Sequence, residues 1–112
     1  MGKKKLKRFA EIASFANVIQ PNDRYPVTDH PHKGNWNRAF FRNDRPIVLE
    51  MGCGKGEYTL ALARKYPGQN FIGIDIKGER LWKGANQALE EGIDNAAFLR
   101  IQAERINYFF GP

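Results

Sequence analysis

The hydrophobic positions of this chain change their rhythm near residue 46. Beyond it, short apolar runs alternate with segments whose apolar residues recur at helical spacing, which is typical of an α/β fold. This pattern predicts strands at 47–51, 70–76 and 96–101 and helices at 55–66, 78–91 and from 104 to 110. Because crossovers between parallel strands are right-handed, we expect these three strands to lie side by side, with the first at one edge.

The first 45 residues follow a different pattern. Apolar residues between 4 and 18 fall at helical spacing and predict a short amphipathic helix. It should end before Pro21, because proline disfavours helix at the preceding residue. Residues 21–46 are rich in proline, asparagine and aspartate and predict a long loop. The aromatic residues of this loop either anchor it to the core, which we favour, or stack on a base: Trp36, Phe40 and Phe41.

The first strand of the alternating region leads an acid into a glycine-rich turn. Glu50 and Met51 precede Gly52, Gly54 and Gly56, and an aspartate, Asp75, closes the next strand. A strand, a glycine turn that opens a helix, and an acid at the next strand end form a nucleoside-binding unit. A dinucleotide site would need a glycine where Glu57 stands, and Glu50 would repel a pyrophosphate. The pattern therefore favours S-adenosylmethionine, which carries ammonium and sulfonium charges, over NAD.

The apolar first strand is unsuited to a free sheet edge. A strand of buried type left at an edge is a pairing or aggregation liability, and ligands of open α/β sheets bind where the strand order reverses. We therefore predict that the remainder of the parent chain, or another copy, covers that edge. The predicted organisation is an arm, short helix and loop over 1–45, followed by the N-terminal half of a Rossmann-like cofactor-binding domain over 46–112.

The net charge of +6 is concentrated at the start of the chain. A basic arm on a nearly neutral body is a possible RNA-binding footprint, and a solvated terminus is the alternative. The candidate RNA-binding residues are Lys3, Lys4, Lys5, Lys7 and Arg8. No apolar run approaches the ~20 residues of a membrane span, and no secretory signal follows the basic start, so we expect a cytoplasmic protein without membrane contact.

The remaining reactive side chains suggest no further chemistry. The single cysteine, Cys53, has no histidine near it in sequence to activate it and is interpreted as a small filler between two glycines. His30 and His32 lack other ligand-type residues at metal spacing, so we predict no metal site and expect them to face solvent or substrate.

Four stretches of the chain resemble the bacterial tRNA (guanine-N7-)-methyltransferases. They read KGNW at 33–36, IVLEMGCGKGEYTLALA at 47–63, FIGIDIKGERLWKGA at 71–85 and AAFLRIQAERINYFF at 96–110. The resemblance implies a class I methyltransferase fold, S-adenosylmethionine as cofactor, and methyl transfer to N7 of a guanosine in tRNA. The cofactor-binding set that it implies is Glu50, Met51, Gly52, Gly54, Gly56, Asp75, Ile76, Gln102 and Ala103.

By position, the resemblance implies that Glu50 and the glycines bind the methionine portion of the cofactor. It implies that Asp75 binds the ribose hydroxyls. Gln102 departs from the family, which usually has an acid before the alanine near the adenine; its carbonyl oxygen can still accept from the adenine amino group. In the family, the catalytic aspartate lies in a motif that follows the fourth strand. Because the pattern here predicts only three such strands, we assign no catalytic residue in this chain. Alternatives are methyl transfer to another substrate, a non-catalytic S-adenosylmethionine- or RNA-binding module and, more remotely, an NAD-dependent dehydrogenase.

Overall fold

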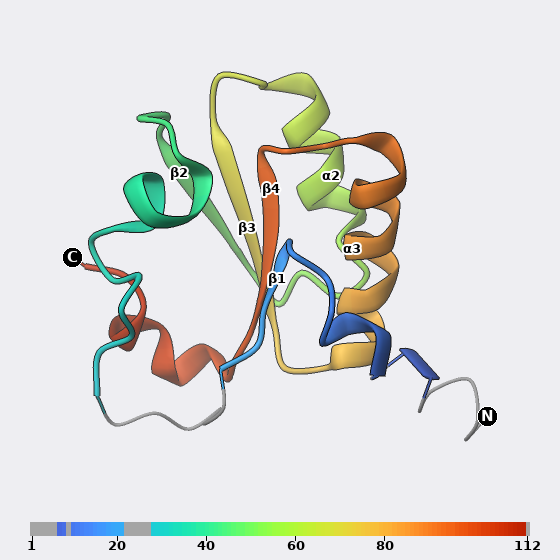
Figure 1. The fold of residues 1–112 in the computed structure, drawn as a ribbon, viewed down its shortest axis with the longest axis horizontal. Helices are drawn as coiled ribbons and strands as arrows, with labels where there is room; N and C mark the ends of the chain where they lie inside the picture. Colours follow the sequence, from blue (N-terminus) through green and yellow to red (C-terminus); the bar gives the residue numbers. More distant parts are fainter. Residues whose placement is uncertain (1–6, 9, 22–27, 112) are drawn as a thin grey trace.

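Four parallel strands form one sheet in the part of the chain that the computed structural model describes, residues 7–8, 10–21 and 28–111. The strands are β1 (Val18–Ile19), β2 (Ile47–Met51), β3 (Asn70–Asp75) and β4 (Ala96–Arg100), in the order β1-β4-β3-β2 (Figure 1). The predicted α/β class is confirmed, as are the three predicted strands, their parallel pairing and the edge position of the first, β2.

Two helices, α2 (Glu57–Lys65) and α3 (Gly78–Glu91), cover one face of the sheet (Figure 1). The side chains of β3 and β4 alternate between the two faces, as a pleated strand requires. Phe71 and Phe98 pack under these helices, whereas Ile72 and Leu99 pack on the opposite face. β3 and β4 are therefore buried on both sides, which explains why they read as continuous apolar runs.

The opposite face is covered by two short, irregular elements. They are η1, a π-helix over Trp36–Phe41, and η2, a 3₁₀ helix over Ala103–Tyr108, which stands where the third helix was predicted. η1 lies in the predicted loop, and its first residue is only 3% exposed. The indole Nε1 of Trp36 donates to the carbonyl of Phe109 at 2.7 Å, and the ring stacks on Phe110 at 5.1 Å. Trp36 thus anchors the loop to the core, as we favoured.

The N-terminal region departs from the single helix predicted over 4–18. Residues 7–8 and 10–12 are helical, residues 4–6 and 9 lie outside the described residues, and the chain then turns to form β1. β1 pairs with β4 in parallel, opposite Phe98 and Leu99, and the Phe98 amide donates to the carbonyl of Asn17 at 2.8 Å. The free edge of β4 stabilises these two residues as a strand, whereas their local pattern is too short to predict one.

Candidate donor-binding cleft

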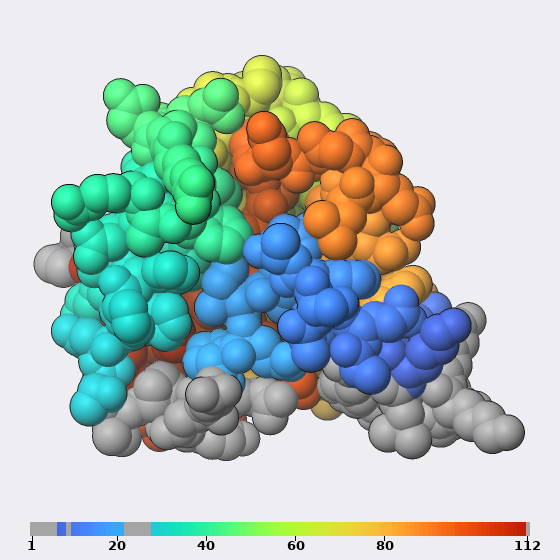
Figure 2. Space-filling view, viewed as in Figure 1, coloured from blue at the N-terminus to red at the C-terminus, as the bar shows by residue number. Residues whose placement is uncertain are grey.

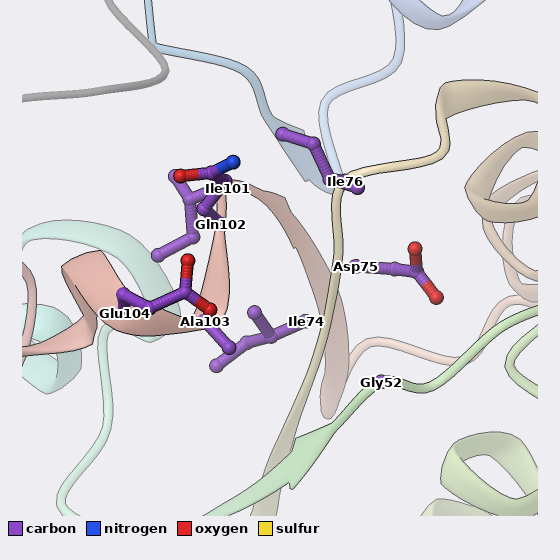
Figure 3. A pocket seen from close by; sticks show the side chains of 8 residues that line it. All are labelled: Gly52, Ile74, Asp75, Ile76, Ile101, Gln102, Ala103 and Glu104. Atoms are coloured by element: carbon purple, nitrogen blue, oxygen red, sulfur yellow. The ribbon is translucent and has the colours of Figure 1, made fainter.

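A cleft of about 290 Å³ opens at the carboxyl ends of β3 and β4, next to the glycine turn (Figure 3). Its lining residues are Gly52, Ile74, Asp75, Ile76, Ile101, Gln102, Ala103 and Glu104. The fold therefore brings together five of the nine predicted cofactor-binding residues, from segments up to 51 positions apart. Ligands of open α/β sheets bind outside the carboxyl ends of the strands, so this cleft lies where a ligand is expected.

The three glycines of the turn have different reasons to be glycine. All three have left-handed backbone, with φ of 65° at Gly52, 58° at Gly54 and 76° at Gly56. A Cβ at Gly52 or Gly54 would meet no atom within 4 Å, so only the backbone conformation demands glycine there. A Cβ at Gly56 would lie 2.7 Å from the Phe98 ring. Gly56 therefore lets α2 approach the sheet, and it does not line the cleft.

Asp75 holds the glycine turn to the end of β3. Its Oδ2 accepts a hydrogen bond from the Gly54 amide and its Oδ1 one from the Lys77 amide, both at 2.9 Å. Figure 3 shows the carboxylate directed away from the side of the cleft that carries Gln102 and Glu104. Each carboxylate oxygen can accept a second hydrogen bond. Asp75 can therefore hold the turn and still accept from a ligand hydroxyl.

Glu50 lies apart from this cleft and lines a neighbouring cavity of about 250 Å³ together with Tyr58 and Thr59. Its Oε2 is buried, as is the Thr59 hydroxyl, and neither has a hydrogen-bond partner among the described residues. Burial raises the pKa of the Glu50 carboxyl, and the nearby Thr59 hydroxyl acts in the opposite direction. A partly desolvated carboxylate with an unused acceptor is suited to a cationic group. Met51, the next residue, is 45% exposed.

The far wall of the cleft comes from the segment that joins β4 to η2. Gln102 and Ala103 lie there, and the Gln102 side chain does not cap the helix that follows. Sequence reasoning missed Glu104, whose carboxylate Figure 3 shows on the same wall. It also missed Ile74 and Ile101, whose apolar side chains read as ordinary strand residues. The available signal for Glu104 was that it is an acid two positions after Gln102, which stands where the family usually has an acid.

Comparison with known proteins decides the family. Residues 44–112 match the sequence profile of a family described as "Putative methyltransferase". The chain belongs to this methyltransferase family. The matched span contains every residue that lines the cleft, and the predicted resemblance to methyltransferases is confirmed.

The chain is also similar to three curated proteins named tRNA (guanine-N(7)-)-methyltransferase. It is 62% identical over 110 residues to the protein of Christiangramia forsetii, covering 96% of this chain and 49% of that protein. It is 50% identical over 111 residues to that of Bacteroides fragilis, covering 98% and 44%. It is 56% identical over 96 residues to that of Porphyromonas gingivalis, covering 86% and 37%. The chain thus spans about half the length of these curated relatives or less.

The basic arm of this methyltransferase family member is described only in part. Lys3, Lys4 and Lys5 lie outside the described residues, and Lys7 is exposed. Arg8 is engaged within the molecule: its side chain is 12% exposed, it lies 3.2 Å from a Glu79 carboxylate oxygen, and it stacks over the Trp82 ring at 4.4 Å. Its guanidinium therefore binds to α3, and the RNA-binding role of the arm stays a prediction.

The other reactive side chains pack against neighbours within the methyltransferase fold, with Cys53 buried and the two histidines half-buried. Cys53 is buried, and burial raises the pKa of its thiol to about 12, which fits the predicted filler and not a nucleophile. His30 and His32 are half-buried, and the prediction that they face solvent or substrate stays a prediction. His30 stacks on Phe109 at 5.0 Å and His32 lies 4.9 Å from Trp36, because both close the aromatic cluster that anchors the loop.

Within residues 7–8, 10–21 and 28–111, the helices are too short or too polar to span a membrane. The same residues hold no group of three or more histidine, cysteine, aspartate or glutamate side chains placed to bind a metal ion.

Proposed function

We propose that the complete protein transfers the methyl group of S-adenosylmethionine to N7 of a guanosine in tRNA, and that residues 46–112 hold the methyl donor. The observation that carries the donor role is the joining of the glycine turn to Asp75 at the rim of the cleft. The substrate is inferred from the relatives' printed name, tRNA (guanine-N(7)-)-methyltransferase. The proposal includes the cytoplasmic location in which tRNA is modified.

The described residues fit S-adenosylmethionine. Glu50, in the neighbouring cavity, offers its ammonium group a carboxylate oxygen without a hydrogen-bond partner, and the left-handed glycine turn would offer backbone groups to its methionine portion. Asp75 retains acceptor capacity for ribose hydroxyls. The apolar side chains of Ile76 and Ile101 suit the faces of an adenine, and the Gln102 amide can accept from its amino group. The remaining members of the proposed set are Met51, Gly52, Gly54 and Ala103, whereas Gly56 supports the turn by packing against Phe98.

This part of the protein contributes to the reaction by positioning the methyl donor. S-adenosylmethionine supplies an electrophilic methyl group on a sulfonium when it is bound. Guanine N7 presents an available lone pair on the major-groove edge, so no proton has to be removed before attack. Holding the two reactants in line can contribute about 7–11 kcal/mol. The residues of the cleft therefore need to bind and orient, and no general base is required of them.

We further propose that the rest of the parent chain, or another copy, covers the free edge of β2. Among the described residues this strand pairs with β3 alone, and three large hydrophobic side chains on it or on the cavity beside it are exposed. They are Val48 (36%), Met51 (45%) and Tyr58 (66%). A bare strand with such neighbours is expected to be covered in the working protein.

The direct test incubates the full-length protein with methyl-labelled S-adenosylmethionine and unmodified tRNA, followed by nucleoside analysis. The expected product is N7-methylguanosine in tRNA. Label in ribosomal RNA, protein or a small molecule instead would show a different methyl acceptor. RNA binding with no transfer to any acceptor would favour a non-catalytic module, and tight binding of NAD would overturn the cofactor.

A further inference from the structure

Arg100, the last residue of β4, joins the cleft to the N-terminal segment, by which we mean residues 7–8 and 10–20. It lies opposite Asp75 in the register of β3 and β4. Its Nε donates to the carbonyl of Ile76 at 2.9 Å, and its Nη1 donates to Oε1 of Gln20. Ile76 lines the cleft, and Gln20 follows directly after β1. One guanidinium therefore connects a wall residue of the cleft to a residue 80 positions away in sequence.

Gln20 is held in place by contacts that do not involve Arg100. β1 pairs with β4 immediately before it, and the Asn17 side chain donates to the Ala85 carbonyl at 3.0 Å in a buried hydrogen bond. The N-terminal segment thus lies against β4 and α3, as Figures 1 and 2 show. Because these contacts position Gln20, its side-chain oxygen is a fixed acceptor for Arg100.

A second contact fastens the same segment close to the cleft. Arg8 contacts Glu79 and Trp82 in the first turns of α3. α3 begins directly after Lys77, whose amide donates to Asp75. The short stretch from Asp75 to Glu79 is therefore fastened to the N-terminal segment at both ends, through Arg100 at Ile76 and through Arg8 at Glu79.

We infer that Arg100 is a positioning residue of the donor cleft, which sets the Ile76 wall by tying its carbonyl to Gln20 of the N-terminal segment. This rests on the proposed function, in which the cleft holds S-adenosylmethionine. Arginine suits the role because its planar guanidinium carries several donors in a fixed fork. A lysine keeps the charge, but its single ammonium on a flexible stem cannot hold two acceptors in the same geometry.

The test compares Arg100→Lys with wild type in the full-length protein. S-adenosylhomocysteine affinity is measured by calorimetry, and steady-state kinetics are measured with S-adenosylmethionine and tRNA. The control is the same substitution at Arg64, an exposed residue of α2 that pairs with Glu91 away from the cleft. Losing a charged hydrogen bond should weaken S-adenosylhomocysteine binding about tenfold. KM for S-adenosylmethionine should rise while kcat and KM for tRNA stay unchanged, and Arg64→Lys should match wild type.

Substitutions at Gln20 separate positioning from general stability. Gln20→Glu keeps an acceptor and should retain the affinity, whereas Gln20→Ala should weaken it in a wild-type Arg100 background. Hydrogen exchange of the ligand-free protein should show faster exchange confined to residues 76–80 in Arg100→Lys and in Gln20→Ala. If Arg100→Lys does not fold, Gln20→Ala carries the same measurements.

The outcomes distinguish this inference from the proposed function. Unchanged affinity and unchanged exchange in both variants would overturn the positioning role, and so would faster exchange across the whole chain. If wild type fails to bind S-adenosylhomocysteine, the proposed function is wrong. Faster exchange confined to 76–80 would in that case still support the connection between Arg100, Ile76 and Gln20.

Discussion

The carboxylate of Asp75 accepts a hydrogen bond of 2.9 Å from the amide of Gly54, a residue 21 positions earlier. The same carboxylate accepts from the Lys77 amide. Asp75 therefore stabilises the glycine turn without any bound ligand. A donor site that is organised in advance loses less freedom on binding.

Asp75→Asn should disorganise this turn. The asparagine oxygen can replace one acceptor, but its NH₂ group then faces a backbone N–H. We expect the free energy of unfolding to fall by about 1–3 kcal/mol and S-adenosylhomocysteine affinity to drop at least about tenfold. Urea unfolding and calorimetry check this, with the exposed Asp44→Asn as the matched control. Equal stability and affinity in Asp75→Asn and wild type would contradict the assigned role.

Glu50→Gln should separate stability from binding. Because burial raises the pKa of Glu50, the ionised form is disfavoured in the folded state. Ionisation of Glu50 therefore lowers the free energy of unfolding. This loss is absent below the ordinary pKa of the carboxyl and grows as pH rises toward its raised pKa. The glutamine variant should therefore be at least as stable as wild type at neutral pH and gain nothing in acid, while S-adenosylhomocysteine binding weakens.

Thermal unfolding at neutral and acidic pH, together with calorimetry, measures both effects at Glu50. The control is Glu90→Gln on the exposed side of α3, where the side chain accepts from Asn86. If Glu50→Gln lowers stability at neutral pH or binds as tightly as wild type, the carboxylate does not have the environment described here.

Gly56→Ala should cost more stability than Gly54→Ala. Both substitutions force a side chain into left-handed backbone, which costs about 1–2 kcal/mol. At Gly56 the new Cβ also overlaps the Phe98 ring, and overpacking adds about 1–3 kcal/mol. Chemical denaturation compares them with Gly68→Ala, where φ is not positive and no atom lies within 4 Å. Equal losses at 54 and 56 would show that the contact with Phe98 is unimportant.

The histidines of the loop should make stability depend on pH. Burial lowers the pKa of both His30 and His32, and the charge of a protonated His32 lowers the pKa of His30 further. A lowered pKa means that the unfolded chain binds more protons, so stability is complete above the ordinary pKa of about 6.5 and is lost as pH falls below it.

Thermal unfolding between about pH 5 and pH 7.5 tests the histidine effect. The melting temperature of wild type should fall toward the acid end more steeply than that of the double variant His30→Gln, His32→Gln. Parallel curves for the two proteins would assign the acid sensitivity to other groups.

Removing residues 2–7 from the full-length protein should weaken tRNA binding and its salt dependence. The deletion takes away four lysines and spares Arg8, which is needed against α3. Each lost phosphate contact should reduce the slope of log K against log salt by about 0.7–0.9. Filter binding at several salt concentrations measures this, with S-adenosylhomocysteine affinity as the internal control. An unchanged slope would mean that the arm is a solvated terminus.

Local pattern was sufficient for the elements whose signals lie within a few residues. α3 begins and ends where its apolar spacing and Gly92 predicted, and β3 differs from its prediction by one residue. β1 and η1 could not be predicted in this way. Val18 and Ile19 become a strand because β4 offers a free edge, and Trp36 holds η1 through a carbonyl 73 residues away.

The sequence by itself determined the family resemblance and the order of acid, glycine turn and second acid, because these signals are consecutive residues and short spacings. Only the tertiary structure decided how the residues are used. It placed Glu104 and Ile101 in the cleft, made Gly56 a packing position against Phe98, and joined Arg100 to Gln20. Each of these depends on contacts between distant segments, and the spacing of residues along one chain does not encode such distances.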